Sequence, residues 1–358
     1  MKVLCSLLLL VSFACLSSAD PTITKDMKKR LDGVPRKTIQ TENYEYYCTG
    51  NCDVDFIPDS TSQGTVLMGG STDVDAAFEW MIDRMGGGDF LVLRTTGSDA
   101  YDPYIYDMGG VNSASTLIIL NRNGSYEPEV SKIIEAADGL FFAGGDQWTY
   151  YSYWKNSPVQ DSVEKIRTRN IPMGGTSAGN AIQPSFIYTA QFGTVYSDQA
   201  LDNPYDYRVT IGADFLRTPY LENAITDTHF AQRDRMGRFM TFVARLIADV
   251  WSSPLAIGVA VDEKTALLID ENGMASTTTV FDDGAVYMLL PDSPPETCTA
   301  NENLEWSNVD VYRITGNATN VYSFATSTKF PQLRSTTSYQ LSASKGKLTS
   351  TQRGGKIY

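Results

Sequence analysis

The sequence of 358 residues is poor in histidine, in clustered basic residues and in long apolar runs. It contains one histidine, which excludes a multi-histidine metal site within the chain. The net charge is −13 and no basic stripe is present, so we expect no nucleic-acid partner, because such binding needs clustered lysine and arginine. Hydrophobic residues make up 42% and charged residues 20% of the chain, which excludes disorder or coiled coil as the main architecture.

One apolar run stands at the start of the sequence. Residues 3–16 are mostly apolar, and Ser17-Ser-Ala19 follow as small residues. The pattern predicts a secretory signal peptide over residues 1–19, since the run is too short for a transmembrane anchor. No later stretch approaches about 20 apolar residues, so we expect a secreted protein without a membrane anchor.

Secretion permits disulfide bonds and glycosylation. Cys48 and Cys52 can close a small loop, and one long-range bridge to Cys298 is the alternative. Asn123 and Asn317 each begin an acceptor sequon for N-glycosylation.

Short apolar segments alternate with helical patterns through the middle of the chain. Apolar runs at 65–68, 90–93, 116–120 and 140–142 predict strands, residues 129–137 and 158–168 predict helices, and residues 171–173 lead into the next glycine pair. This alternation indicates parallel βαβ units with helices on both faces of a mostly parallel sheet. Residues 257–293 instead predict an antiparallel edge. We therefore expect four segments: signal peptide 1–19, N-terminal extension 20–61, catalytic α/β domain 62–298 and β-prone C-terminal extension 299–358.

The sharpest local motif is Gly175-Thr-Ser-Ala-Gly179, which fits the nucleophile elbow G-x-S-x-G. Ser177 would stand on a tight turn between a strand and a helix, and the amide of Ala178 would donate to an oxyanion. A serine nucleophile needs a base, and His229 is the histidine that the chain offers. The acid that orients it is left open by spacing alone: the candidates are Asp262, Glu263, Asp198, Asp202, Asp206 and Asp214.

Four motifs together carry a resemblance. They are Ala143-Gly-Gly-Asp-Gln147, Gly174-Gly-Thr-Ser-Ala-Gly179, Asp227-Thr-His-Phe230 with Arg233-Asp-Arg-Met-Gly-Arg238, and Gly258-Val-Ala-Val-Asp-Glu263. In this order they resemble the cyanophycinases, members of the serine-peptidase family that also holds dipeptidase E, over about residues 62–292. The resemblance implies a flavodoxin-like α/β sandwich similar to the class I glutamine amidotransferases.

The resemblance also implies roles for single residues. Ser177 matches the nucleophile, His229 the general base and Glu263 the third member of the triad. The second oxyanion-hole amide would come from the loop that contains Gly145 and Asp146. The positions that match the substrate pocket of the family are Gln147, Asp227, Arg233, Arg235 and Arg238, with Gln147 expected to hold an amide and Asp227 a guanidinium.

Cyanophycinases cut a poly-aspartate that carries arginine on each β-carboxyl, so the resemblance implies a peptide or isopeptide substrate carrying aspartate, and no metal or organic cofactor. One departure is Thr228, which replaces the amide residue that usually precedes the family histidine. The segments before residue 62 and after about Cys298 have no obvious counterpart in the family. A homodimer is a general expectation only, because two-fold dimers are common.

Other classes of protein compete with this interpretation. A secreted esterase or lipase also has an elbow, but there the acid precedes a histidine that lies late in the chain. A glutamine amidotransferase carries cysteine in its elbow. The remaining alternative is a catalytically silent secreted glycoprotein that uses the same fold for binding.

Overall fold

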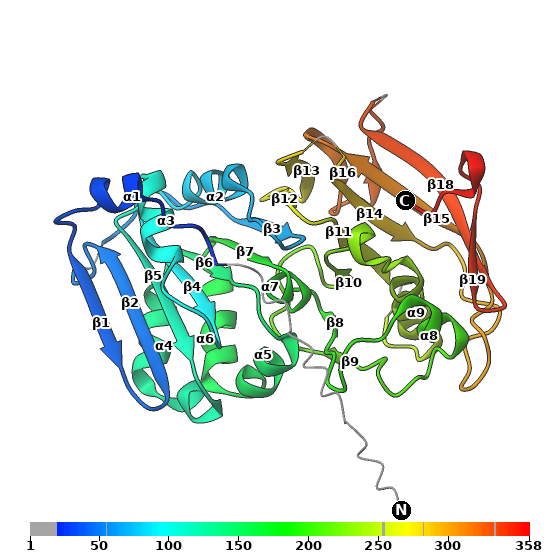
Figure 1. Ribbon diagram of the computed structural model, residues 1–358, viewed down its shortest axis with the longest axis horizontal. Coiled ribbons are helices and arrows are strands. Elements are labelled where there is room, and N and C mark those ends of the chain that lie inside the picture. Colours follow the sequence, from blue (N-terminus) through cyan, green and yellow to red (C-terminus); the bar gives the residue numbers. More distant parts are fainter. Residues whose placement is uncertain (1–19, 55, 253–254, 282, 333) are drawn as a thin grey trace, which may run out of the picture.

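The computed structural model describes residues 20–358 except 55, 253–254, 282 and 333, so the predicted signal peptide lies outside the described residues (Figure 1). Over the described residues the strands form two mixed sheets, one of eleven strands and one of eight. The two sheets are called here the first and the second sheet.

The first sheet has a parallel centre and antiparallel ends. Its strands follow one another in the order β1 (Arg36–Gln40), β2 (Tyr44–Gly50), β5 (Ser113–Ile119), β4 (Asp89–Arg94), β6 (Gly139–Phe142), β7 (Pro172–Thr176), β3 (Gly64–Met68), β12 (Thr265–Asp270), β13 (Met274–Thr279), β16 (Ala318–Ser323) and β17 (Thr328–Lys329). Only the run from β5 to β3 is parallel. The expectation of a mostly parallel sheet is therefore wrong outside this centre, where hairpins and returning strands extend the sheet at both ends.

Helices cover both faces of the parallel centre, as the alternation of strand and helix predicts (Figure 1). Along β4, Phe90 and Val92 pack with α2 and α3, whereas Leu91 and Leu93 pack with α4 and α6 on the opposite face. Successive side chains of a strand point to opposite faces, so a continuous apolar run is what a strand buried on both sides requires. The helices are α1 (Lys25–Arg30), α2 (Asp75–Ile82), α3 (Tyr101–Met108), α4 (Pro128–Ala136), α5 (Gln147–Trp154), α6 (Pro158–Arg167), α7 (Ala178–Ala181), α8 (Ser197–Asp202) and α9 (Met236–Ala248), with single 3₁₀ turns η1 (Arg122–Tyr126), η2 (Ala231–Arg233) and η3 (Arg353–Gly355).

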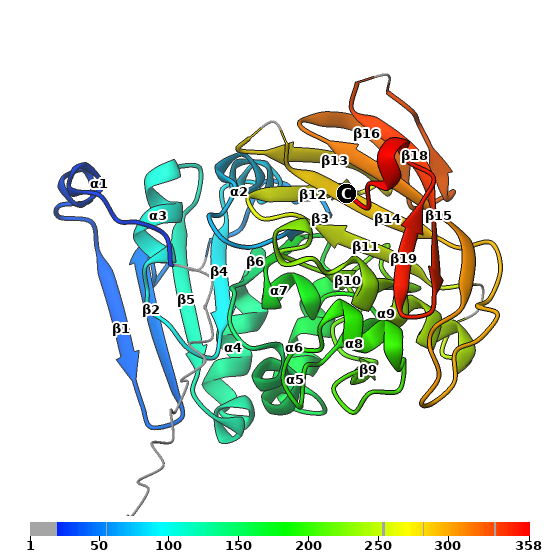
Figure 2. The ribbon, with the colours of Figure 1, turned by 45° about the vertical axis from the view of Figure 1, so that its right-hand side comes forward.

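The second sheet is mainly antiparallel. Its order is β19 (Lys347–Ser350), β18 (Thr336–Ser344), β15 (Trp306–Thr315), β14 (Ala285–Leu290), β11 (Ile257–Val261), β10 (Ala224–Asp227), β8 (Phe186–Tyr188) and β9 (Ile211–Ala213). Its parallel pairs are β8 with β10 and β10 with β11. Side chains of β11 and β14 pack against β3 and β12 of the first sheet, so the two sheets share a core where they meet (Figure 2).

The segments outside the predicted catalytic domain join these sheets. β2 pairs with β5 of the first sheet, and β1 pairs with β2. Beyond residue 299, β15 pairs with β14 in the second sheet, while β16 pairs with β13 in the first. Residues 299–358 thus contain strands β15 to β19, which continue the two sheets. The prediction of an antiparallel edge at 257–293 is wrong, because these strands lie inside the sheets: β11 is parallel to β10 and antiparallel to β14, and β15 and β16 pair beyond β14 and β13.

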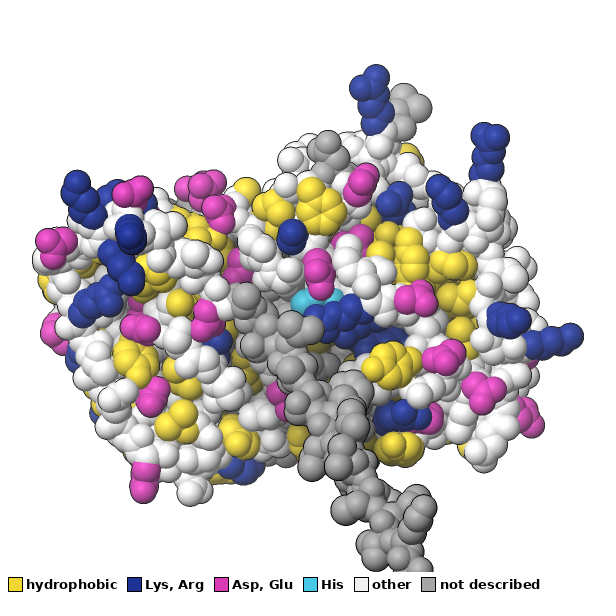
Figure 3. All heavy atoms as spheres, in the orientation of Figure 1, with side chains coloured by type: hydrophobic (Ala, Val, Ile, Leu, Met, Phe, Trp, Pro, Cys, Tyr) yellow, Lys and Arg dark blue, Asp and Glu magenta, His cyan; other side chains and the backbone are white. Residues whose placement is uncertain are grey.

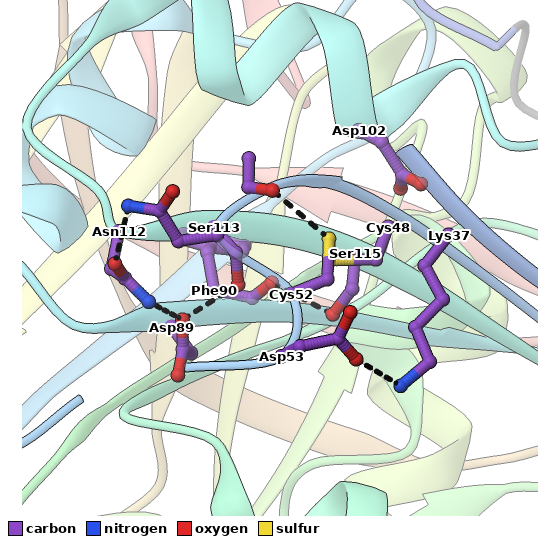
Figure 4. The surroundings of a disulfide bond; sticks show 12 residues. Lys37, Cys48, Cys52, Asp53, Asp89, Phe90, Asp102, Asn112, Ser113 and Ser115 are labelled. Carbon is purple, nitrogen blue, oxygen red and sulfur yellow. Dashed lines mark hydrogen bonds and ion pairs between the residues drawn. A yellow bond between two sulfur atoms is a disulfide. The ribbon is translucent and has the colours of Figure 1, made fainter. Parts of the chain in front are cut away.

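The small loop predicted from the cysteines is present. Cys48 and Cys52 form a disulfide whose Cα atoms lie 6.0 Å apart (Figure 4). Cys298 carries a free thiol in the core beside α9, where burial raises its pKa to about 12, so the long-range bridge does not form.

Asn123 and Asn317 of the two sequons are exposed. Among the described helices, none combines the length and the apolar character needed to cross a membrane.

Candidate active site

Ser177 lies on the tight turn that the motif predicts. β7 ends at Thr176, α7 begins at Ala178, and Ser177 between them has φ 52° and ψ −117°. Such a backbone is strained for a residue with a side chain and persists only where its surroundings fix it. Glycines on both sides allow the chain to pack closely around this turn. A Cβ on Gly175 would lie 2.4 Å from the Gly179 carbonyl oxygen, and a Cβ on Gly179 would lie 1.9 Å from the Phe142 carbonyl oxygen.

The histidine and the acid come from the second sheet. The parallel strands β10 and β11 end side by side, and His229 and Glu263 follow them. The Ser177 Oγ lies 2.8 Å from His229 Nε2, and His229 Nδ1 lies 2.7 Å from Glu263 Oε1. With the proton on Nδ1, the imidazole donates to Glu263 and accepts from the serine hydroxyl, which is the arrangement of a serine–histidine–acid triad.

Among the acids that spacing left open, Asp262 is the neighbour of Glu263 but points elsewhere. Its carboxylate accepts from the backbone N–H of Ala231 at 2.8 Å and of Ala285 at 3.2 Å. Asp262 therefore joins Ala231, just after His229, to the first residue of β14, and Glu263 is the acid that reaches the imidazole.

The imidazole is held in its neutral form. Burial, followed by the charge of Arg233, lowers the pKa of His229 to about 4, against the opposing effect of the hydrogen bond to Glu263. A neutral imidazole at pH 7 is free to accept a proton from Ser177.

Gly70 is a site residue that sequence reasoning missed. A Cβ on Gly70 would lie 2.5 Å from both Cε1 and Nε2 of His229 and 3.0 Å from the Cβ of Ser177. Its φ of +97° also favours glycine. The signal available was the glycine pair that ends the strand at 64–68, but no local pattern says which side chain a glycine makes room for.

The predicted oxyanion loop is fixed by an aromatic side chain. The Tyr150 hydroxyl lies 2.9 Å from the carbonyl oxygens of both Ala143 and Gly144, just before Gly145. Asp146 caps α5, where its carboxylate accepts from the Trp148 N–H at 3.0 Å, so only its backbone is left for an oxyanion. On the other side, Ala178 is the first residue of α7, a position whose N–H has no partner within the helix.

A cavity of about 790 Å³ borders this loop and the arginine segment. It is lined by Gly145, Asp146, Gln147, Trp148, Tyr196, Arg233, Asp234, Arg235 and Arg238, among others. His229 is cyan in Figure 3 and lies beside a dark-blue group of basic side chains. Ser177 is 9% exposed, so the reacting atoms lie just beneath the surface.

The predicted pocket residues take different roles. Gln147 lines the cavity and donates from Nε2 to the Tyr188 carbonyl at 3.2 Å. Arg233 is 38% exposed and lies 3.8 Å from Glu263, and it faces the cavity. Arg235 is 12% exposed and donates to the Thr228 carbonyl at 2.7 Å. Arg235 also lies 3.5 Å from Asp227 Oδ1, and burial and the neighbouring Arg238 lower its pKa to about 9.

Asp227 does not face the cavity. Its two carboxylate oxygens accept from Arg238 Nε at 2.8 Å and from Nη2 at 2.5 Å, and both side chains are 4% exposed. Burial alone would raise the pKa of Asp227, but Arg238 and Arg235 hold it below the usual value. The expectation that Asp227 holds a substrate guanidinium is therefore corrected: its carboxylate is paired with Arg238 and Arg235 of the chain itself.

No cluster of three or more histidine, cysteine, aspartate or glutamate side chains that could hold a metal ion occurs among the described residues. The side chains assembled here are those of acid–base and nucleophilic chemistry.

Comparison with protein-family models finds no match. Among solved structures, a peptidase from an acI-B1 actinobacterium overlaps 65% of this chain and 92% of its own at a TM-score of 0.45 and 16% identity. A putative peptidase E protein from Listeria monocytogenes overlaps 61% of this chain at a TM-score of 0.40 and 12% identity.

In sequence, a cyanophycinase from Nostoc sp. is 25% identical over 213 residues, and one from Synechococcus elongatus is 24% identical over 183 residues. In sequence the chain is thus similar to proteins named cyanophycinase. The Nostoc match covers 58% of this chain and 65% of the relative, and the Synechococcus match covers 51% of each. The likeness to the cyanophycinases thus spans less than two thirds of their length.

Proposed function

We propose that the protein is a secreted serine exopeptidase that hydrolyses β-aspartyl peptides, such as β-Asp-Arg units, or related aspartyl peptides. The observation that carries the proposal is the hydrogen-bonded series Ser177, His229 and Glu263, with distances of 2.8 Å and 2.7 Å, beside a cavity lined by arginine. The relation to proteins named cyanophycinase supports the substrate class.

The reaction follows from the positions of these groups. The Ser177 oxygen attacks the substrate carbonyl carbon while its proton passes to His229 Nε2. Backbone N–H groups at Ala178 and in the Gly145–Asp146 loop stabilise the negative oxygen that forms. When the tetrahedral intermediate collapses, the departing amine takes the proton from His229 and an ester remains on Ser177. Water then adds to the ester with the same base, which releases the acid product and the free serine.

The arginines determine the charge of the substrate. Arg233 and Arg235 line the cavity, and the buried carboxylate of Asp227 is shared between Arg238 at 2.5 Å and Arg235 at 3.5 Å, so it does not neutralise both cations. Guanidinium groups bind carboxylates with two parallel hydrogen bonds, and each aspartyl unit of a β-linked peptide presents a free carboxylate. Thr228 stands where the family has an amide residue, and its side chain is buried, so the detailed substrate preference is expected to differ from that of the bacterial relatives.

Secretion is part of the same proposal. It is supported by the apolar segment at residues 3–16, by two exposed sequons and by the Cys48–Cys52 disulfide, because disulfides persist in oxidising compartments.

The test is release of dipeptides or arginine from β-Asp-Arg polymer and from a panel of α- and β-aspartyl peptides. Ser177→Ala should lower the rate by about 10³-fold or more, whereas Ser115→Ala, which removes a buried serine hydroxyl from β5, should leave it unchanged. Serine-dependent cleavage of short aspartyl peptides alone would favour a dipeptidase. Absence of serine-dependent turnover across the panel would contradict the proposal and favour a binding protein.

A further inference from the structure

We propose that Tyr358 is a positioning residue: it fixes the turn at Asp234, and this turn places Arg233 and Arg235 in the wall of the substrate cavity. Its effect on turnover rests on the proposed function, whereas its effect on the turn does not. The residue belongs to the segment after residue 299, which lies outside the resemblance to the cyanophycinases.

Tyr358 contacts the arginine segment through its hydroxyl group. The hydroxyl donates to Asp234 Oδ1 at 2.9 Å and accepts from the Met236 N–H at 2.9 Å. Burial and the hydrogen bond to Asp234 raise the pKa of Tyr358, so the hydroxyl keeps the proton that it donates. One side chain thus bridges the turn and the first residue of α9.

The turn that it bridges has an unusual backbone. Asp234 ends the 3₁₀ turn η2 in the left-handed region, with φ 50° and ψ 56°. Residues with side chains adopt this conformation only where contacts hold it. The Ser197 hydroxyl donates to the Asp234 carbonyl at 2.5 Å, and Tyr358 holds the carboxylate of the same residue. Arg233 and Arg235 flank Asp234, so its conformation sets the direction of both.

The aromatic ring of Tyr358 is also seated against the histidine loop. It packs edge-on against Phe230, which follows His229, with ring centroids 5.8 Å apart, and against Tyr287 at 5.9 Å. The preceding residue is tied in as well, because the Tyr339 hydroxyl donates to the Ile357 carbonyl at 2.7 Å. The end of the described chain is therefore held by the second sheet and in turn holds the arginine turn.

Tyr358→Phe separates the two contributions, because it keeps the ring and removes the hydroxyl. We expect KM for aspartyl peptides to rise by about three- to tenfold with kcat changed by less than about twofold, a change of the size expected for the loss of one ordinary hydrogen bond. The matched control is Tyr312→Phe, whose hydroxyl donates to the Val321 carbonyl at 3.1 Å in the core between the sheets. That variant should leave KM unchanged.

A second measurement does not depend on turnover. Amide hydrogen exchange, read by mass spectrometry of peptides covering residues 229–238, should become faster in Tyr358→Phe and stay as in the wild type in Tyr312→Phe. Asp234→Ala removes the other partner, and its effect on exchange and KM should not add to that of Tyr358→Phe. This variant also covers the case in which Tyr358→Phe fails to fold.

The outcomes distinguish the two proposals. Unchanged exchange over residues 229–238 in Tyr358→Phe, or an equal change in Tyr312→Phe, would overturn the role of Tyr358. Faster exchange in a protein that cleaves none of the peptides would sustain the role of Tyr358 and overturn the proposed function instead.

Discussion

The two sheets contribute to the candidate site in different ways. The parallel centre of the first sheet supplies Ser177, the Gly145–Asp146 loop and Gly70, all at the carboxyl ends of its strands. The second sheet is mostly antiparallel, yet one of its two parallel pairs, β10 and β11, supplies His229 and Glu263 at the same kind of strand end. Parallel strands end at one edge of a sheet, so the site forms where two such edges meet. The hydrogen bonds between Ser177, His229 and Glu263 therefore depend on how the two sheets are placed relative to each other.

Backbone hydrogen bonds fix the position of the two sheets relative to each other. The His229 N–H donates to the Gly69 carbonyl at 2.8 Å, and the Lys264 N–H donates to the Gly70 carbonyl at 3.0 Å. Both bonds join a loop of the second sheet to the end of β3 in the first.

The largest expected effect on stability comes from the buried ion pair between Asp227 of β10, in the second sheet, and Arg238. Asp227→Ala leaves the buried Arg238 guanidinium without its partner, and removing one member of a buried pair costs about 3–5 kcal/mol of stability. Denaturant unfolding should show this loss. The matched control is Asp53→Ala, in which an exposed pair with Lys37 is lost and less than about 1 kcal/mol is expected. Equal losses in the two variants would contradict the structural role of Asp227.

A methyl group added where the two sheets meet should displace the His229 ring. Gly70→Ala places a Cβ against the His229 ring, and displacement of a reacting group by about 1 Å costs about 100-fold in rate. The activity to follow is cleavage of the aspartyl peptides. Gly109→Ala shares the positive φ but meets no atom within 4 Å, so it should keep full activity. Full activity in Gly70→Ala would show that the triad geometry is not the one described.

Loss of the Cys48–Cys52 disulfide, at the end of the first sheet away from the triad, should lower stability without changing activity. Paired Cys48→Ser and Cys52→Ser substitutions release a short loop and should cost about 2 kcal/mol of stability in the chain-entropy view. Peptide cleavage should be unchanged, because the loop borders a different cavity from the one at the active site. A fall in kcat of the folded variant would contradict this separation.

The smallest effect concerns pH. Imidazole protonation sets the acid limb of kcat/KM, and the lowered pKa of His229 places that limb near pH 4. Arg233 lowers this pKa, so Arg233→Gln should move the limb to higher pH. Glu263→Gln removes an interaction that raises the pKa and should move the limb in the opposite direction. A limb that stays in place in both variants would show that His229 is not the group that titrates.

The sequence predicts the parallel centre and much of the site for physical reasons. β3, β4 and β6 are buried on both faces and therefore appear as apolar runs. Ser177 is found because its elbow needs glycines at fixed spacing, and His229 because no other histidine competes. Glu263 followed from the family motif, since several aspartates stood at equally suitable spacing.

Other parts depend on contacts between distant segments. β1 is a polar strand whose pairing with β2 determines its conformation, so no apolar pattern marks it. Gly70 leaves room for His229, which lies 159 positions later in the chain (229 − 70), so no local sequence pattern records this contact. Asp227 looked like a ligand for substrate, because a sequence does not show which arginine a carboxylate has already bound.

The single histidine turns the site into its own spectroscopic reporter. In an untagged preparation, every imidazole resonance in a nuclear magnetic resonance spectrum arises from His229, and a downfield Nδ1 proton would report its hydrogen bond to Glu263. Titration of that one signal follows protonation without labels or assignment by mutation. Because the imidazole bridges the two sheets, the same signal also records whether they remain joined as the protein unfolds.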